Sequence, residues 1–160
     1  ISPERKAALN RNLMLFFTGF SRFSSDIQVS AEQNLKSKQG RLLEMKALVD
    51  DAERILTSKT SLDEFGRLLD YTWKLKRGFS DQVTTDSIDA VYEKAIRAGA
   101  VGGKLLGAGG GGFLLFYVIP ERQEAIRAAL QDLLYVPFEF ETAGTRVIHY
   151  TPESYEPREG

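Results

Sequence analysis

The chain has 160 residues, of which 42% are hydrophobic and 27% charged, and its formal net charge is −1. This length suffices for one domain with a substantial core, and the near-neutral charge argues against a nucleic-acid partner. The absence of cysteine excludes disulfides, thiolate metal sites and a cysteine nucleophile. We find no apolar run long enough to span a membrane and no signal-like start, so we expect a soluble, cytoplasmic protein with no membrane partner.

In chain order, the first apolar segment is Leu13–Gly19, which predicts a short buried strand. A long helix with one buried stripe is expected over about 29–56, where apolar residues recur at spacings of three, four and seven. Ser61–Glu64 has the pattern of a capping box and opens a second helix. A third helix is expected over 87–97, closed by Gly99. The residues of the stripe are Leu35, Leu42, Met45, Val49, Ala52 and Leu56.

The second half of the chain predicts a sheet. A glycine-rich segment is followed by an apolar strand to Ile119, and Pro120 then opens a helix. Two strands near 135–141 and 145–150 are expected to form a terminal hairpin. Because the helices are grouped rather than alternating with strands, the order favours an α+β fold with an antiparallel sheet covered on one face. We expect a single domain over 1–160.

The most informative segment is Gly102–Gly112, which contains the four consecutive glycines Gly109–Gly112. Glycine is less favourable than alanine in a regular element by roughly 0.5–1 kcal/mol, so such a run is expected where the backbone must approach something closely. Consecutive backbone N–H groups bind phosphates and other anions. The segment therefore predicts an anion-binding loop, and a plain connector is the alternative.

Two familiar nucleotide-binding patterns do not fit this segment. Gly107–Gly112 satisfies G-x-G-x-x-G, but the dinucleotide fingerprint needs a strand before it and a helix after it. Here we expect a helix, the loop and then a strand. The stretch Gly99–Lys104 has one spacer too few for a P-loop, and Leu105 stands where a hydroxyl should bind Mg²⁺. Neither type of nucleotide-binding domain is predicted.

The segment Gly102–Phe113 closely resembles the third sequence motif of the GHMP small-molecule kinases, which include galactokinase, homoserine kinase and mevalonate kinase. Leu15–Ser24, Trp73–Arg77 and Ser87–Asp89 resemble the heptose kinases that phosphorylate D-glycero-D-manno-heptose 7-phosphate. The resemblance spans about residues 12–150. It implies a ferredoxin-like α+β domain, namely the C-terminal half of such a kinase.

The resemblance also has consequences for activity. Members of the family bind ATP with an N-terminal loop resembling Pro-x-Gly-x-Gly-Leu-Gly-Ser-Ser-Ala, which has no match in this chain. The resemblance thus implies a whole protein that transfers phosphate from ATP, with Mg²⁺ entering through ATP, to an alcohol group of a sugar phosphate. It implies that this chain alone lacks the ATP-binding half and is inactive, and it names no catalytic base. The long helix offers a surface for a homodimer.

The resemblance places the glycine loop beside the active site, near substrate and terminal phosphates. Arg22, beside Ser21, is a candidate clamp for a sugar phosphate, because guanidinium binds phosphate through two hydrogen bonds; the alternative is a surface arginine. Lys104 either adds positive charge or is simply solvated. The candidate phosphate- and substrate-binding residues are Ser21, Arg22, Lys104, Gly107, Ala108, Gly109, Gly110, Gly111 and Gly112.

Several other polar and aromatic residues have structural interpretations. Trp73 is expected to line the core, and Lys74, Lys76 and Arg77 to complement the end of their helix. Asp89 and the single histidine, His149, are expected to be structural, and no spacing predicts a metal site. A non-enzymatic ligand-binding or regulatory module on the same fold is the alternative function.

Overall fold

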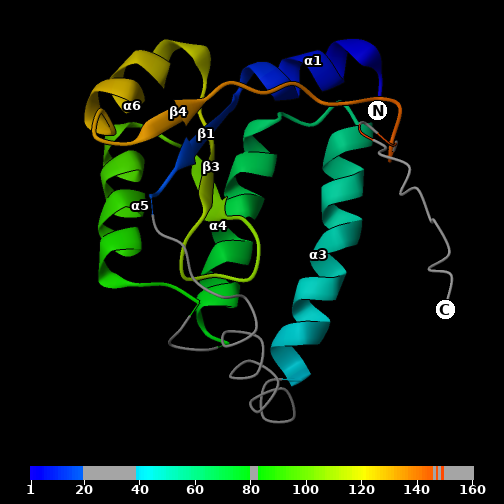
Figure 1. Cartoon of the computed structure of the whole chain (residues 1–160). Helices are drawn as coiled ribbons and strands as arrows, with labels where there is room; N and C mark the ends of the chain where they lie inside the picture. The colour runs from blue at the N-terminus through cyan, green and yellow to red at the C-terminus, as the bar shows by residue number, and fades with distance from the viewer. Residues whose placement is uncertain (20–38, 80–82, 146, 148, 150–160) are drawn as a thin grey trace, which may run out of the picture.

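The computed structural model describes residues 1–19, 39–79, 83–145, 147 and 149 (Figure 1). The candidate clamp residues Ser21 and Arg22 lie outside the described residues. The helices and strands are α1 (Pro3–Arg11), β1 (Leu13–Phe17), α3 (Gln39–Thr57), α4 (Asp63–Arg77), α5 (Asp86–Ala98), β2 (Gly102–Leu105), β3 (Phe113–Tyr117), η2 (Pro120–Arg122), α6 (Gln123–Ala129) and β4 (Leu134–Val136).

The four strands form one antiparallel sheet in the order β2-β3-β1-β4. Strand β1 is central, and its register pairs Leu13 with Tyr117 and Phe17 with Phe113. The chain follows the ferredoxin-like topology. Its order is a strand, a helical crossover, a hairpin, a second helical crossover and a last strand. The predicted α+β class is therefore confirmed.

Because side chains alternate along a strand, the sheet has two distinct apolar faces. One face, with Met14, Phe16 and Phe116, packs against α5 and α6. On the other face Leu13 and Tyr117 pack against Leu69 of α4 and Leu9 of α1. The expectation that helices cover only one face is wrong, because the long crossover between β1 and β2 places α4 and α5 on opposite sides of the sheet.

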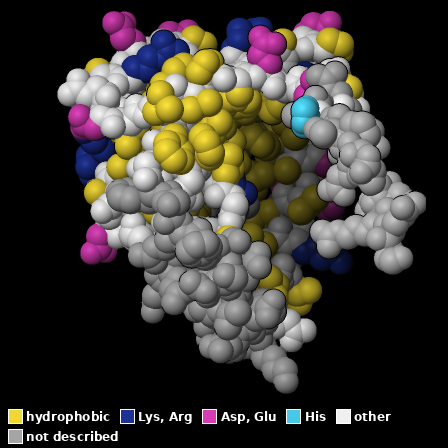
Figure 2. All heavy atoms as spheres, in the orientation of Figure 1, with side chains coloured by type: hydrophobic (Ala, Val, Ile, Leu, Met, Phe, Trp, Pro, Cys, Tyr) yellow, Lys and Arg dark blue, Asp and Glu magenta, His cyan; other side chains and the backbone are white. Residues whose placement is uncertain are grey.

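Part of the second face is left open by these helices. Phe17 and Phe113 stack there with ring centroids 5.1 Å apart, and Phe113 remains 38% exposed. Leu134 of the neighbouring strand β4 is 65% exposed. Figure 2 shows hydrophobic side chains gathered over this part of the sheet, beside a hollow. The glycine loop extends from the same end of β3 (Figure 1).

The prediction for the long helix is wrong in its buried stripe. Within α3, which begins at Gln39 in the described residues, only Ile55 is buried. Leu42 is 39% exposed and Val49 is 63% exposed. Helix α3 packs mainly against α4 and lies at the outside of the molecule (Figure 1), so one neighbouring helix covers only part of its apolar surface.

Two further elements, a helix and a strand, differ from the sequence predictions. Helix α1 was not predicted, although Ser2 caps it and Pro3 occupies its first turn. Its Arg5 fastens it by donating to the carbonyls of Leu56 and Thr60, at 2.9 and 2.6 Å. Gly102–Leu105, expected to be loop, is strand β2.

The predicted terminal hairpin is also wrong in the described residues. Strand β4 ends at Val136 and pairs with β1 rather than with a following strand. Of the predicted strand over 145–150, the described residues 145, 147 and 149 are not in a strand.

Candidate functional site: the glycine loop and its lysines

Strand β2 carries the glycine loop and lies unusually close to α4. A Cβ atom placed on Gly102 would come within 2.0 Å of the carbonyl oxygen of Gly66 in α4. Only glycine at position 102 permits this contact between the strand and the helix backbones. The close packing places the C-terminal end of α4 next to the start of the loop.

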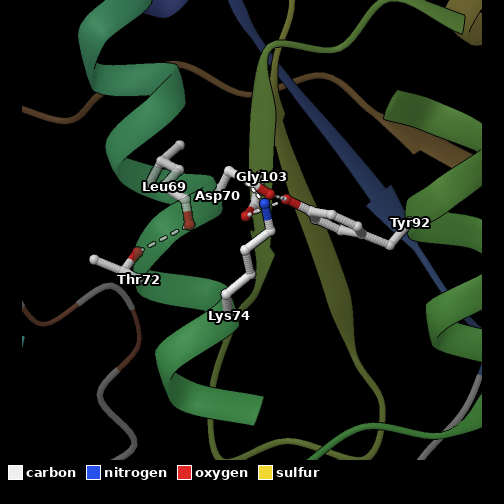
Figure 3. A network of polar contacts seen from close by, with 6 residues as sticks. All are labelled: Leu69, Asp70, Thr72, Lys74, Tyr92 and Gly103. Atoms are coloured by element: carbon white, nitrogen blue, oxygen red, sulfur yellow. Dashed lines mark hydrogen bonds and ion pairs between the residues drawn. The ribbon is translucent and has the colours of Figure 1, made fainter. Parts of the chain in front are cut away.

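The hydrogen bonds of Tyr92 hold the same strand from the other side (Figure 3). The Tyr92 hydroxyl donates to Asp70 of α4 at 2.7 Å and to the carbonyl of Gly103 at 3.3 Å. Lys74 pairs with the same carboxylate at 2.6 Å. Burial first, and then the hydrogen bond to Asp70, raise the pKa of Tyr92 above its ordinary value, so the phenol is neutral at physiological pH. The network ties β2 to α4 and α5 immediately before Lys104.

The loop from Leu106 to Gly112 adopts a backbone conformation that favours glycine. The φ angles of Gly107, Gly109, Gly110 and Gly112 are +81°, +129°, +72° and +98°. Residues other than glycine rarely adopt such φ angles. The glycine density that dominates the sequence is therefore required by the shape of the loop.

The loop is fastened at both ends and in its middle. The amide of Leu106 donates to the carbonyl of Phe113 at 2.8 Å, which closes the hairpin. Both the amide and the hydroxyl of Thr18 donate to the carbonyl of Gly112, at 2.8 and 2.9 Å. In the middle, the amide of Gly110 donates to the carbonyl of Val83 at 3.0 Å. The loop is thus held in one shape by neighbouring backbone.

Several amides of the loop keep their hydrogen-bonding capacity. Within the part of the chain that the structure describes, five of them donate to no protein acceptor. Backbone N–H groups gathered in this way provide partial positive charge for an anion, and they need no rearrangement when it binds. These five amides belong to Gly107, Ala108, Gly109, Gly111 and Gly112.

Two lysines add full positive charge to the same place. The ammonium group of Lys76, near the end of α4, donates a hydrogen bond to the carbonyl of Gly107. Burial first, and then the charge of Lys104, lower the pKa of Lys76 below its ordinary value. The predicted site residue Lys104 lies on strand β2, directly before the loop, and its role stays a prediction. Lys76, which the sequence interpretation assigned to the helix terminus, contacts the loop.

The neighbouring cations of α4 are neutralised by carboxylates, in contrast to these two. Arg77 pairs with Asp89 at 2.6 Å, and Asp89 also accepts from the Thr84 hydroxyl at 2.7 Å. These contacts agree with the structural role expected for Asp89. Together with Thr85, which caps α5, these residues line an open hollow of about 470 Å³. Trp73 is fully buried beside Tyr92, as predicted for a core residue.

The described residues offer neither a metal site nor a membrane-spanning helix. No group of three or more His, Asp or Glu side chains among them is arranged to hold a metal ion. Likewise, no helix in the described ranges combines the length and the apolar character needed to cross a bilayer. The polar features of the described chain instead converge on the glycine loop, which has donors and positive charge suited to a phosphate.

The class that the fold and the loop define is an α+β domain in which a glycine-rich loop joins two antiparallel strands. Residues 46–136 match the family described as GHMP kinases C terminal, and this match covers more than half of the chain. The chain belongs to this family. The resemblance of the glycine segment to the GHMP kinases is thereby confirmed.

Two curated relatives show which kinases the chain is similar to. It is 31% identical over 145 residues to a D-glycero-alpha-D-manno-heptose 7-phosphate kinase of Campylobacter jejuni, a match that covers 86% of this chain and 42% of that protein. It is 35% identical over 89 residues to a mevalonate kinase of Pyrococcus horikoshii, covering 54% of this chain and 26% of that protein. The chain spans less than half the length of these relatives.

A solved structure supports the fold independently. The crystal structure of mevalonate kinase from L. major in complex with R-mevalonate superposes with a TM-score of 0.66 at 18% identity, covering 77% of this chain and 40% of that chain. At this identity the comparison supports the fold alone. The chain is thus a GHMP kinase C-terminal domain related to sugar and mevalonate kinases.

Proposed function

We propose that the whole protein transfers a phosphoryl group from ATP to a hydroxyl of a phosphorylated sugar, D-glycero-D-manno-heptose 7-phosphate or a related compound. In this proposal the present chain supplies the domain that binds substrate and phosphate. The observation that carries it is the row of loop amides that donate to no acceptor among the described residues, flanked by Lys76 and Lys104. The similarity to the Campylobacter jejuni heptose phosphate kinase favours a sugar phosphate as the acceptor.

The residues of this chain suit phosphoryl transfer for a physical reason. The transferred group carries negative charge on three equatorial oxygens, so catalysis depends mainly on positioning and on fixed positive charge. The loop is fastened to neighbouring backbone, the Lys76 ammonium donates to the carbonyl of Gly107, and Lys104 lies on the adjoining strand β2. ATP, when bound, supplies the phosphoryl group, and Mg²⁺ that accompanies it neutralises charge on its phosphates. We assign Mg²⁺ no ligand among the described residues, consistent with their lack of an acidic cluster.

The same proposal includes three further points. The acceptor group is an alcohol, the protein is cytoplasmic, and the isolated chain has no catalytic activity. The chain covers 42% of the length of its heptose phosphate kinase relative, and it contains no segment resembling the N-terminal ATP-binding loop of the family. An isolated half that binds substrate but not nucleotide would turn nothing over. Turnover by the 160-residue chain alone would contradict this part of the proposal.

The test is a comparison of acceptors with the longest natural polypeptide that contains this chain. ADP release is measured with ATP, Mg²⁺ and, in turn, heptose 7-phosphate, galactose and mevalonate. We expect kcat/KM for the heptose phosphate to exceed that for galactose by at least about a hundredfold, since a site that binds a charged group discriminates strongly against a neutral substrate without it. Equal activity on all three would reject the sugar phosphate as the preferred acceptor, and absent activity on all three would favour the non-enzymatic alternative.

A further inference from the structure

The end of α4 carries three cations, and they differ in their surroundings. Lys74 is paired with Asp70, and Arg77 with Asp89, each at 2.6 Å. Lys76 lies between them in sequence, yet it forms no ion pair with any carboxylate of the described residues. Of these three cations, Lys76 is therefore the one whose charge no carboxylate of the described residues neutralises.

The position of Lys76 indicates what its charge is available for. Its ammonium group reaches from α4 to the loop and donates to the carbonyl of Gly107, the first glycine of the loop. Lys104 approaches from β2, and among the described residues it too lacks an ion pair. Two ammonium groups in one partly buried place repel each other, and an anion between them would remove this repulsion.

We infer that Lys76 is a specificity-determining residue that binds, together with Lys104 and the free amides of the loop, a phosphate group of a ligand. The inference rests on the proposed function for its biological meaning, since a sugar phosphate and ATP both carry such a group. The bound phosphate would accept hydrogen bonds from Lys76, from Lys104 and from loop amides such as that of Gly109. The lowered pKa of Lys76 agrees with this arrangement, because a bound dianion would raise it again.

The first experiment measures the affinity of inorganic phosphate by calorimetry for the whole chain and its variants. We expect Lys76→Met to weaken binding at least about tenfold, as for loss of one charge-assisted hydrogen bond. Lys76→Arg, which keeps the charge, should stay within about threefold of the wild type. The matched control is Lys94→Met, which removes one charge from an exposed position on α5. Equal losses in Lys76→Met and Lys94→Met, or no loss in Lys76→Met, would overturn the inference.

A second measurement needs no variant and so does not depend on folding of a mutant. The titration of the Lys76 side-chain nitrogen is followed by NMR with and without inorganic phosphate. Phosphate should shift the midpoint to higher pH for Lys76 and leave Lys94 unchanged. If the titration midpoint of Lys76 does not change at saturating phosphate, the inference is overturned. Failure of the wild-type chain to bind phosphate would overturn it as well.

Kinetics on the intact protein identify the source of the phosphate. A raised KM for the sugar phosphate in Lys76→Met, with KM for ATP unchanged, assigns the acceptor's phosphate, and the reverse pattern assigns the nucleotide. Loss of phosphate affinity in a protein that phosphorylates no sugar would retain the inference and reject the proposed function. Sugar kinase activity with wild-type kcat and KM in Lys76→Met would retain the proposed function and reject the inference about Lys76.

Discussion

The amide of Gly110 donates a 3.0 Å hydrogen bond to the carbonyl of Val83, which joins the glycine loop to the connection between α4 and α5. Val83 is 2% exposed, so the acceptor belongs to the core and cannot move freely. This bond orients the middle of the loop while neighbouring amides stay available. The shape of the candidate site therefore depends on packing far from it in sequence.

The same contact predicts different costs for one substitution at two glycines. Gly107→Ala and Gly109→Ala both place a side chain at positive φ, which costs about 1–2 kcal/mol. At Gly107 the added Cβ meets no atom within 4 Å, whereas at Gly109 it would lie 2.7 Å from the Val83 carbonyl oxygen.

We therefore expect Gly109→Ala to displace the loop and to weaken phosphate binding more than tenfold. Gly107→Ala should lower stability by about 1–2 kcal/mol and keep most of the binding. Thermal unfolding and phosphate calorimetry on both variants check this. Indistinguishable variants would mean that contact with Val83 does not set the loop's shape.

The buried tyrosines predict a loss of stability at alkaline pH. Burial is the main cause that raises the pKa of Tyr117 to about 12, and burial raises the pKa of Tyr92 as well. In the unfolded chain both phenols ionise near pH 10. The folded state then holds more protons, so its stability is complete below pH 10 and is lost as pH rises from 10 towards 12 and beyond.

Each tyrosine should contribute a slope of about 1.4 kcal/mol per pH unit in this range. Tyr117→Phe should remove one such slope between pH 10.5 and 12, when the free energy of unfolding is measured in urea. It should also lower stability at pH 7, since the Tyr117 hydroxyl accepts from Asn12 at 2.7 Å and donates to Asp63 at 3.2 Å. An unchanged slope in Tyr117→Phe would refute the assignment.

Helix α3 offers an apolar surface for self-association, which we propose as the basis of a homodimer. Leu43 is 61% and Val49 is 63% exposed, and both lie on the described part of this helix. Changing Leu42 and Val49 to glutamate should convert a dimer to a monomer in light scattering and should leave the fold unchanged, because neither side chain is buried. Lys94→Glu on α5 is the control. A wild-type chain that is monomeric at millimolar concentration would exclude this interface.

The sequence predicted helices α4 and α5 well, whereas it misjudged the burial of α3 and missed the loosely attached α1. Helices α4 and α5 have clear apolar faces and terminal signals, and both were expected. Helix α1 buries only Leu9 and is held largely through the hydrogen bonds of Arg5, which leave no periodic pattern. Strand β2 contains two glycines because it touches α4, and such a strand looks like a loop in sequence.

The residues of the candidate site were likewise predicted only in part. Glycine density and resemblance pointed to the loop and to Lys104. Lys76 was missed because its contact with Gly107 spans 31 positions in the chain, and no local pattern encodes that contact. Its place within Trp73–Arg77, the segment that resembles heptose kinases, was the one available signal. The fold decides which of three neighbouring cations is left for a ligand.

The most direct test of the central claim is an NMR titration of the loop amides with inorganic phosphate. The free amides of Gly107, Ala108, Gly109, Gly111 and Gly112 should shift strongly and saturate together. The amides of Leu106 and Gly110, which already donate to protein carbonyls, should shift much less and serve as internal controls. If phosphate shifts no loop amide, or shifts all of them equally with the exposed helix surfaces, the glycine loop is not a phosphate site and the account is contradicted.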